Sequence, residues 1–113
     1  MRRLALICLL LLAPALARAD GWIETLDIPL MPGLTVNADS ETVFETAEGR
    51  VVVVRAAGPV ARSAVESYYA SALDGLGWQA GPQGGLLRDG ERMELEFIRN
   101  DGETVVTFRL APR

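Results

Sequence analysis

The clearest hydrophobic pattern in the chain is the alternation over residues 92–110. Met93, Leu95 and Phe97 alternate with polar positions, and an Asp-Gly pair follows at residues 101–102. Such a pair favours a two-residue hairpin turn. This turn predicts one register, in which the paired residues are Phe97 with Val106, Leu95 with Phe108, Met93 with Leu110, and Glu94 with Arg109. A slip by one residue would oppose apolar and polar positions, so the pattern itself favours this register.

A second hairpin is predicted earlier in the chain, from residues 42–47 and 50–57. With Glu48-Gly49 as the loop, Phe44 pairs with Val53. Phe44, Val51 and Val53 then share one face. The run Val51–Val54 is apolar on both faces, which indicates a strand that is covered on both sides. Shorter strands are predicted at residues 78–80 and 86–88, with Asp89-Gly90 as a further two-residue turn.

Between the hairpins, the periodicity predicts one amphipathic helix over about residues 59–76. Pro59 suits a first helical position, Gly58 can cap it, and Gly77 suits the left-handed residue after the helix. At 100° steps, one broad face collects the following residues: Ala61, Ala64, Val65, Tyr68, Tyr69, Ala72 and Leu76, with Leu73 at its edge. We expect Tyr68 and Tyr69 to pack in the core; the alternative is a binding edge at Tyr69.

The order of elements predicts an α+β fold, ββαβββ, with an antiparallel sheet of about five strands and the helix on one face. The strand order does not follow from the pattern. The expected helix-facing set is Phe44, Val51, Val53, Leu86, Met93, Leu95, Phe97, Val106, Phe108 and Leu110.

Residues 20–40 are predicted to form an extended arm, ahead of a single domain over residues 41–113. Pro29 and Pro32 exclude a continuous helix there. The second sheet face is partly apolar, and we expect the arm to cover it through Trp22, Ile28, Leu30 and Met31; the alternative is an open surface. The residues of a possible ligand or partner surface are Trp22, Val43, Val52, Val54, Trp78, Ile98 and Val105.

Residues 1–19 resemble an export signal. Arg2 and Arg3 precede an apolar run, and Ala17-Arg18-Ala19 forms a cleavage site before Asp20. The run is shorter than the ~20 residues of a membrane span, so we expect no stable span after cleavage; an uncleaved anchor is the alternative. The one cysteine, Cys8, would leave with the signal. A periplasmic or secreted location is therefore expected.

Charge and residue types restrict the function further. Beyond residue 19 there are eight arginines against fifteen acidic residues, a formal charge of −7, which argues against nucleic acid as a partner. The whole chain has no histidine and no lysine, and its only cysteine is Cys8. This excludes Ser-His-Asp and Cys-His catalysis, Schiff-base chemistry and the usual zinc ligands. No cofactor, metal site or catalytic residue is expected. Glu94 and Glu96 could form an acid–base pair, but a solvated face is the simpler interpretation.

Several segments together resemble small exported proteins of Gram-negative bacteria that have no assigned activity. They are Asp27–Leu34 with its Pro-x-x-Pro-Gly arm, Tyr68-Tyr69 with Leu76-Gly77-Trp78, and the acidic hairpin after them. The resemblance implies a periplasmic α+β domain of unknown function, and it transfers no binding or catalytic residue.

These observations predict a non-enzymatic, exported domain that binds a protein or an envelope component. The alternative is a carrier of a small apolar ligand, held between the arm and the sheet or under the helix near Trp78. An enzyme that uses only carboxylates is a third hypothesis.

Overall fold

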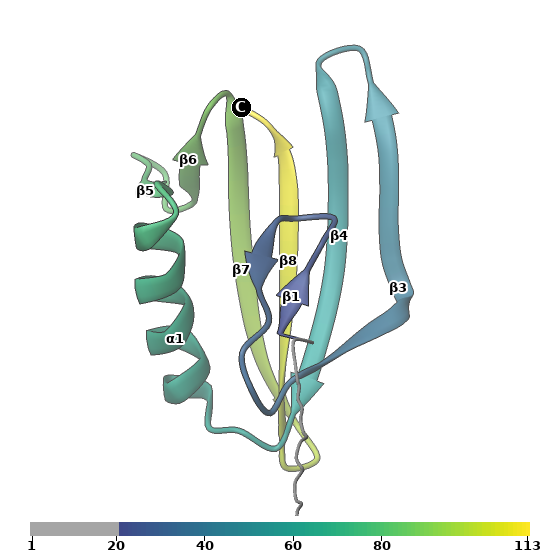
Figure 1. Cartoon of the computed structure of the whole chain (residues 1–113), viewed down its shortest axis with the longest axis vertical. Helices are drawn as coiled ribbons and strands as arrows, with labels where there is room; N and C mark the ends of the chain where they lie inside the picture. The colour runs from purple at the N-terminus through teal and green to yellow at the C-terminus, as the bar shows by residue number, and fades with distance from the viewer. Residues whose placement is uncertain (1–20) are drawn as a thin grey trace, which may run out of the picture.

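The computed structural model describes residues 21–113, so the predicted signal, its cleavage site and Cys8 lie outside the described residues. One helix and two antiparallel sheets make up the fold (Figure 1). The α+β class is confirmed, with more than the five strands expected. The elements are β1 (Trp22–Ile23), β2 (Ile28–Pro29), β3 (Thr35–Thr46), β4 (Gly49–Gly58), α1 (Arg62–Gly75), β5 (Gln79–Ala80), β6 (Leu86–Arg88), β7 (Glu91–Asn100) and β8 (Glu103–Pro112).

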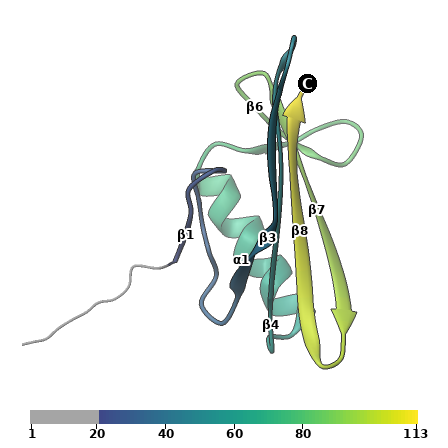
Figure 2. The same ribbon diagram turned by 90° about the vertical axis from the view of Figure 1, so that its right-hand side faces the viewer.

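The main sheet has the strand order β3-β4-β8-β7-β6-β5, and β1 and β2 form a small sheet of their own. Seen along the sheet, α1 and the β1–β2 segment lie on the same side of it (Figure 2). The core lies between these two elements and the sheet. Within residues 21–113 no helix has the length and apolar character needed to cross a membrane.

The predicted register of the last hairpin is confirmed. Phe97 pairs with Val106, and Leu95 pairs with Phe108. Asp101 and Gly102 have φ values of 52° and 80°, the left-handed conformation that a primed two-residue turn needs. Turn chemistry and hydrophobic alternation therefore agree here.

The register predicted for the first hairpin is wrong by two residues. Its turn is Ala47-Glu48, so Thr46 pairs with Gly49 and Phe44 pairs with Val51. The reason is a side chain. The Thr46 hydroxyl accepts hydrogen bonds from the N–H groups of Glu48 and Gly49 and donates one to the Gly49 carbonyl, at 2.7 Å. These bonds close the turn at Ala47-Glu48, one residue earlier than the turn predicted from the position of Gly49.

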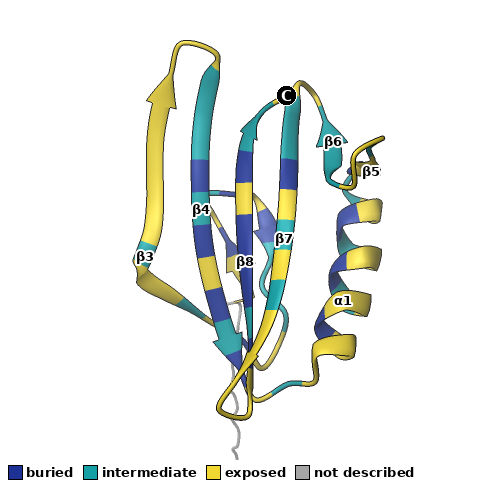
Figure 3. Ribbon diagram, turned by 180° about the vertical axis from the view of Figure 1, so that it is seen from behind, coloured by how far each residue is buried: buried dark blue, intermediate teal, exposed yellow. Residues whose placement is uncertain are grey.

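The face assigned to this hairpin also needs correction. Phe44, Val51 and Val53 do share a face, but it is the face away from the helix. Val52 and Val54 face the core instead, because they pair with Leu110 and Phe108 of β8 and are fully buried. Figure 3 shows this alternation of buried and exposed positions along β4 and β8.

The helix is shorter than predicted at its start. Gly58 still belongs to β4, and α1 begins at Arg62 with Ala61 as the N-cap. The connecting Val60 carbonyl accepts hydrogen bonds from Thr104 and from Arg99, which hold the chain away from a helical path. The end is as predicted, with Gly77 at φ 92° and its N–H bonded to the Asp74 carbonyl.

The buried helix face is narrower than predicted, and its centre is shifted. Val65, Tyr69 and Leu73 are buried, so the buried face is centred on Tyr69, and Leu73 at its edge is fully covered. Ala61 and Ala64 are exposed. Tyr69 is buried in the core, whereas Tyr68 is only partly buried against it; the Tyr69 ring contacts Tyr68 and Phe108 edge-on, at centroid distances of 4.9 and 5.0 Å.

The arm does not cover the second sheet face, which corrects the expectation above. Its buried residues, Ile23, Leu26, Ile28 and Leu34, belong to the same core as the helix. The Tyr69 hydroxyl accepts a hydrogen bond from the Met31 N–H and donates one to the Pro29 carbonyl. The first part of the arm therefore packs beside α1, and its last residues already belong to β3.

Candidate functional site

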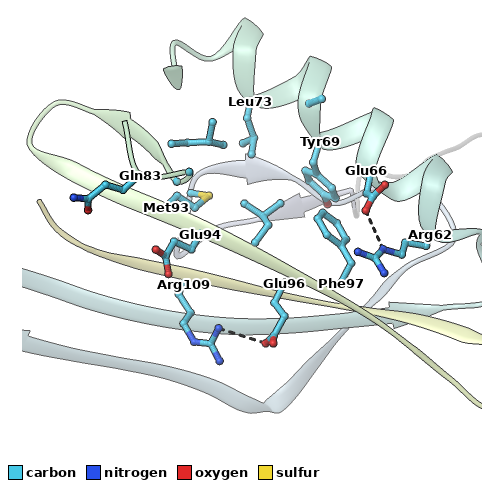
Figure 4. Close-up of a pocket in the computed structure, with 15 residues that line it drawn as sticks. Arg62, Glu66, Tyr69, Leu73, Gln83, Met93, Glu94, Glu96, Phe97 and Arg109 are labelled. Carbon is cyan, nitrogen blue, oxygen red and sulfur yellow. Dashed lines mark hydrogen bonds and ion pairs between the residues drawn. The ribbon is translucent and has the colours of Figure 1, made fainter. Parts of the chain in front are cut away.

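A hollow lies between α1 and β7, and we call it the α1–β7 groove. Its volume is about 800 Å³, and it is open to solvent along one side. It is lined by Arg62, Glu66, Tyr69, Ala70, Leu73, Gln83, Gly84, Gly85, Leu86, Met93, Glu94, Leu95, Glu96, Phe97 and Arg109. Figure 4 shows the apolar side chains between the helix and the strands, with charged side chains at the rim.

The groove exists because β6 is too short to cover β7. Leu86–Arg88 pair only with Glu91–Met93, and then the chain turns away at Gly85. The remainder of β7, from Glu94 to Asn100, has β8 on one side and no strand on the other, and the groove borders its first part, Glu94–Phe97. This part of β7 is therefore an open edge of the main sheet.

Backbone groups of two β7 residues point into that opening. Asn100 pairs with Glu103 across a two-residue turn, so the two residues exchange both of their backbone hydrogen bonds. The backbone groups of successive residues in a strand point alternately toward and away from the neighbouring strand. Counting back from Asn100, the N–H and C=O groups of Leu95 and Phe97 therefore point away from β8. Among residues 21–113, no other backbone group bonds to them at this edge.

The floor beside this edge is apolar. The side chains of Leu95 and Phe97 lie on the helix side of the sheet and are half-buried. Leu73 and Tyr69 of α1 face them across the groove, and both are buried. A side chain that entered the groove would meet hydrocarbon and aromatic surface.

The rim is charged, with each charge paired. Arg62 and Glu66 form an ion pair at 2.9 Å on the helix. On the strand side, Glu94 pairs with Arg92 at 3.1 Å. Glu96 lies 3.5 Å from Arg109. The Glu94 and Glu96 side chains are both about half exposed, so the arrangement is that of a solvated rim and not of an enclosed acid–base pair.

One end of the groove is closed by the segment between α1 and β7. Arg88 donates a hydrogen bond to the Leu76 carbonyl at 2.8 Å, and its guanidinium lies 4.6 Å from the centre of the Trp78 ring. Arg92 donates to the Gln83 carbonyl at 3.2 Å. These bonds tie the helix end and the Gly81–Gly85 loop to the sheet, so the groove has a defined end there.

The residues predicted to form a ligand or partner surface do not form one surface. Val52, Val54 and Trp78 are buried in the core. Ile98 and Val105 do pair with each other on the face away from the helix, where Ile98 is half exposed. Two further members stand apart: Val43 lies on the helix side of β3 and Trp22 lies in the arm, and both are half exposed.

The sequence interpretation missed the groove residues as a site, although it identified most of them as core. Leu95 and Phe97 carry no chemical signature beyond alternation. The sequence feature that could have indicated the groove is the difference in length between two neighbouring strands. Leu86–Arg88 has three residues, and the strand that follows it is much longer. That difference leaves part of the longer strand without a neighbour.

Within residues 21–113 there is no cluster of three or more histidine, cysteine, aspartate or glutamate residues that could hold a metal ion. Comparison with protein-family models gives no match, and comparisons with curated proteins and with solved structures give none either. Functional inference therefore starts from the groove.

Proposed function

We propose that this protein is a non-enzymatic binding domain that takes up an extended segment of a partner protein in the α1–β7 groove. The segment adds a strand to the main sheet at the open edge of β7. The single observation that carries the proposal is the position of the free Leu95 and Phe97 backbone groups, which face away from β8 on the open edge that borders the groove. Strand addition at a sheet edge is a recurrent way for domains to bind peptides.

The backbone supplies the affinity that is independent of sequence. Each outward-facing residue of β7 offers one N–H and one C=O, so Leu95 and Phe97 together offer two donors and two acceptors. The open edge runs from Glu94 to Asn100. At roughly 3.3 Å per residue, it accommodates a segment of about five to seven residues.

The side chains supply the selectivity. Residues of a bound strand that lie opposite Leu95 and Phe97 point to the helix side, where they contact Leu73 and Tyr69. The residues between them point to the other face, beside Glu94 and Glu96. We therefore expect a segment with apolar residues at every second position.

The proposed location is the periplasm. The support is the sequence of residues 1–19, together with a remaining chain that contains no cysteine. The residue types of the whole chain also support a binding role over catalysis, because histidine is absent.

The proposal is tested by selecting binders from a library of random decapeptides, with an Ala70→Trp variant as the counter-selection. Ala70 is an exposed helix residue that lines the groove, so a tryptophan there fills the groove without altering the core. Ser63→Trp is the matched control, because Ser63 is exposed on the same helix and does not line the groove. We expect binders that tolerate Ser63→Trp and lose at least about tenfold in affinity with Ala70→Trp.

Amide hydrogen exchange then identifies the binding mode. Strand addition protects the N–H groups of Leu95 and Phe97, while those of Glu94 and Glu96 stay as they are because β8 already bonds them. Binders that protect neither Leu95 nor Phe97, or that bind the Ala70→Trp variant equally well, contradict the proposal.

A carrier of a small apolar ligand is the second candidate, and the groove is the place that favours it. The arm lies on the helix side, so the space between arm and outer sheet face that the sequence suggested is not formed. A volume of about 800 Å³ is in the range of small-molecule sites, although the open side resembles a peptide groove more closely. Native mass spectrometry of freshly purified protein separates the two, because a carrier retains its ligand.

A further inference from the structure

The opposite edge of the main sheet has a second, independent feature. β3 is the terminal strand, and its last part, Thr42–Thr46, is exposed on both faces. Phe44 is 51% exposed on the face away from the helix, and Val43 is 50% exposed on the helix side. Neither the arm nor α1 reaches this part of the hairpin (Figure 1). An edge with two large apolar residues favours pairing with another strand.

The hairpin determines which backbone groups of β3 are free. Thr46 pairs with Gly49 across the two-residue turn, so these two residues exchange both of their backbone hydrogen bonds. By alternation, Thr42, Phe44 and Thr46 direct their backbone groups to β4. Val43 and Glu45 direct theirs outward. A bulge between Asn37 and Thr42 interrupts the regular strand, which restricts continuous pairing to Thr42–Thr46.

We propose that two copies of this chain associate through this edge, as an antiparallel β3–β3 pair centred on Phe44. A two-fold axis perpendicular to the sheet keeps each face continuous from one copy to the other. Residues that lie opposite each other in the two copies must then have their side chains on the same face. This requires that the axis pass through a pair formed by one residue and the same residue of the other copy.

Repulsion between like charges, together with the bulge, determines which residue can lie on the two-fold axis. With Val43 at the axis, Glu41 lies opposite Glu45 of the other copy. With Glu45 at the axis, two identical carboxylates oppose each other. With Thr42 at the axis, Phe44 would lie opposite Ser40, which is inside the bulge, so the regular pairing would be cut short. Like charges directly opposite each other on neighbouring strands are destabilising.

The centre at Phe44 avoids these conflicts, and it is the centre that pairs the whole Thr42–Thr46 segment with its copy. Thr42 then lies opposite Thr46, and Val43 lies opposite Glu45. The outward backbone groups of Val43 and Glu45 meet those of Glu45 and Val43 in the other copy, so both ends of the pair are hydrogen-bonded. Glu45 also has Arg50 as its neighbour on β4, which offsets part of its charge.

The two Phe44 side chains meet at the axis in a pair that is not hydrogen-bonded, where side chains are closest. This contact buries aromatic surface that one copy leaves exposed, and aromatic pairs add to the stability of such contacts. The dimer is independent of the groove, because β3 and the β7–β5 side are at opposite ends of the strand order. Each dimer therefore presents two grooves outward.

Single-cysteine variants test the register directly. In a full chain that carries Cys8→Ser, a cysteine is introduced at Val43, Phe44 or Glu45, and each variant is oxidised under the same conditions. The proposal expects covalent dimers from Phe44→Cys in at least about tenfold excess over Val43→Cys and Glu45→Cys, because only residue 44 lies opposite its own copy. Dimers that form chiefly at residue 43 or 45 overturn this register.

Sedimentation equilibrium without any cysteine tests the association itself. We expect a concentration-dependent dimer that Phe44→Asp weakens by about tenfold or more. Ile98→Asp is the matched control, because Ile98 is 47% exposed on the same face but lies on β7. Circular dichroism of each variant verifies folding. A wild-type protein that stays monomeric up to millimolar concentration overturns the proposal, and so does an equal effect of the two aspartates.

Discussion

The Tyr69 hydroxyl accepts a hydrogen bond from the Met31 N–H at 3.0 Å, which joins the helix to the N-terminal arm. The same hydroxyl donates to the Pro29 carbonyl at 2.9 Å. One buried phenol thus satisfies a donor and an acceptor in a segment that has little regular structure of its own. The arm forms one side of the core, so these two bonds contribute to the stability of the whole domain.

Tyr69→Phe should lower the free energy of unfolding by about 1–3 kcal/mol, because it leaves the Met31 N–H and the Pro29 carbonyl without their partner. Chemical denaturation measures the loss, and amide exchange at Met31 should become faster. Tyr68→Phe is the control, because no hydrogen bond to the Tyr68 hydroxyl is present within the described residues. Equal losses in the two variants would contradict a specific role of the Tyr69 hydroxyl.

Stability should also fall in alkaline solution, and Tyr69 is the cause. Burial, the largest influence, raises the pKa of Tyr69 from its ordinary 10.0 to about 12. Above about pH 10 the unfolded chain loses this phenolic proton while the folded chain keeps it, so folding becomes less favourable as pH rises toward 12. Below about pH 10, Tyr69 is protonated in both the folded and the unfolded chain, so its contribution to the free energy of unfolding is fully present.

Denaturation midpoints measured at intervals from pH 9 to about pH 12 check this sign. Tyr69→Phe should show a shallower decline than the wild type, whereas Tyr68→Phe should keep the decline of the wild type. A Tyr69→Phe profile that is parallel to the wild-type profile would assign the alkaline loss to other groups.

Gly58→Ala should destabilise the protein strongly, by about 2 kcal/mol or more. A Cβ at Gly58 would overlap the Gly33 carbonyl oxygen and lie 3.2 Å from the Leu34 Cα, so either the arm or β4 must move. Gly75→Ala is the comparison, since a Cβ there meets nothing within 4 Å at the end of α1. We expect Gly75→Ala to be neutral or slightly stabilising in thermal denaturation. Similar melting temperatures for the two variants would argue against close approach of the arm.

Local signals in the sequence were sufficient for the hairpins that contain Asp-Gly. Asp101-Gly102 adopts the left-handed conformations expected of it, and the alternation of Leu95 and Phe97 sets the same register. They failed at the first hairpin, where the Thr46 hydroxyl closes a turn that contains no residue with positive φ before Gly49. A hydrogen bond from a threonine side chain to the turn backbone is difficult to predict from residue types alone.

The candidate site was not predictable from single segments. The groove depends on β6 pairing with only the first residues of β7, and on α1 lying beside the part that remains. Likewise, Val52 and Val54 were assigned to the open face because their strand was not yet placed next to β8. Period-two alternation divides a strand into two faces, but it does not say which face meets the helix.

The sequence by itself determined the α+β class, the left-handed Gly77 just after the helix and the register of β7 with β8, because these depend on contacts between residues close in the chain. The tertiary structure decided the strand order, the side of the sheet on which the arm lies, and the two open edges at β3 and β7. These depend on contacts between distant segments, such as Tyr69 with Met31. The physical reason is that hydrophobic burial is not directional: it requires that apolar faces be covered, and only the assembled fold determines which segment covers each one.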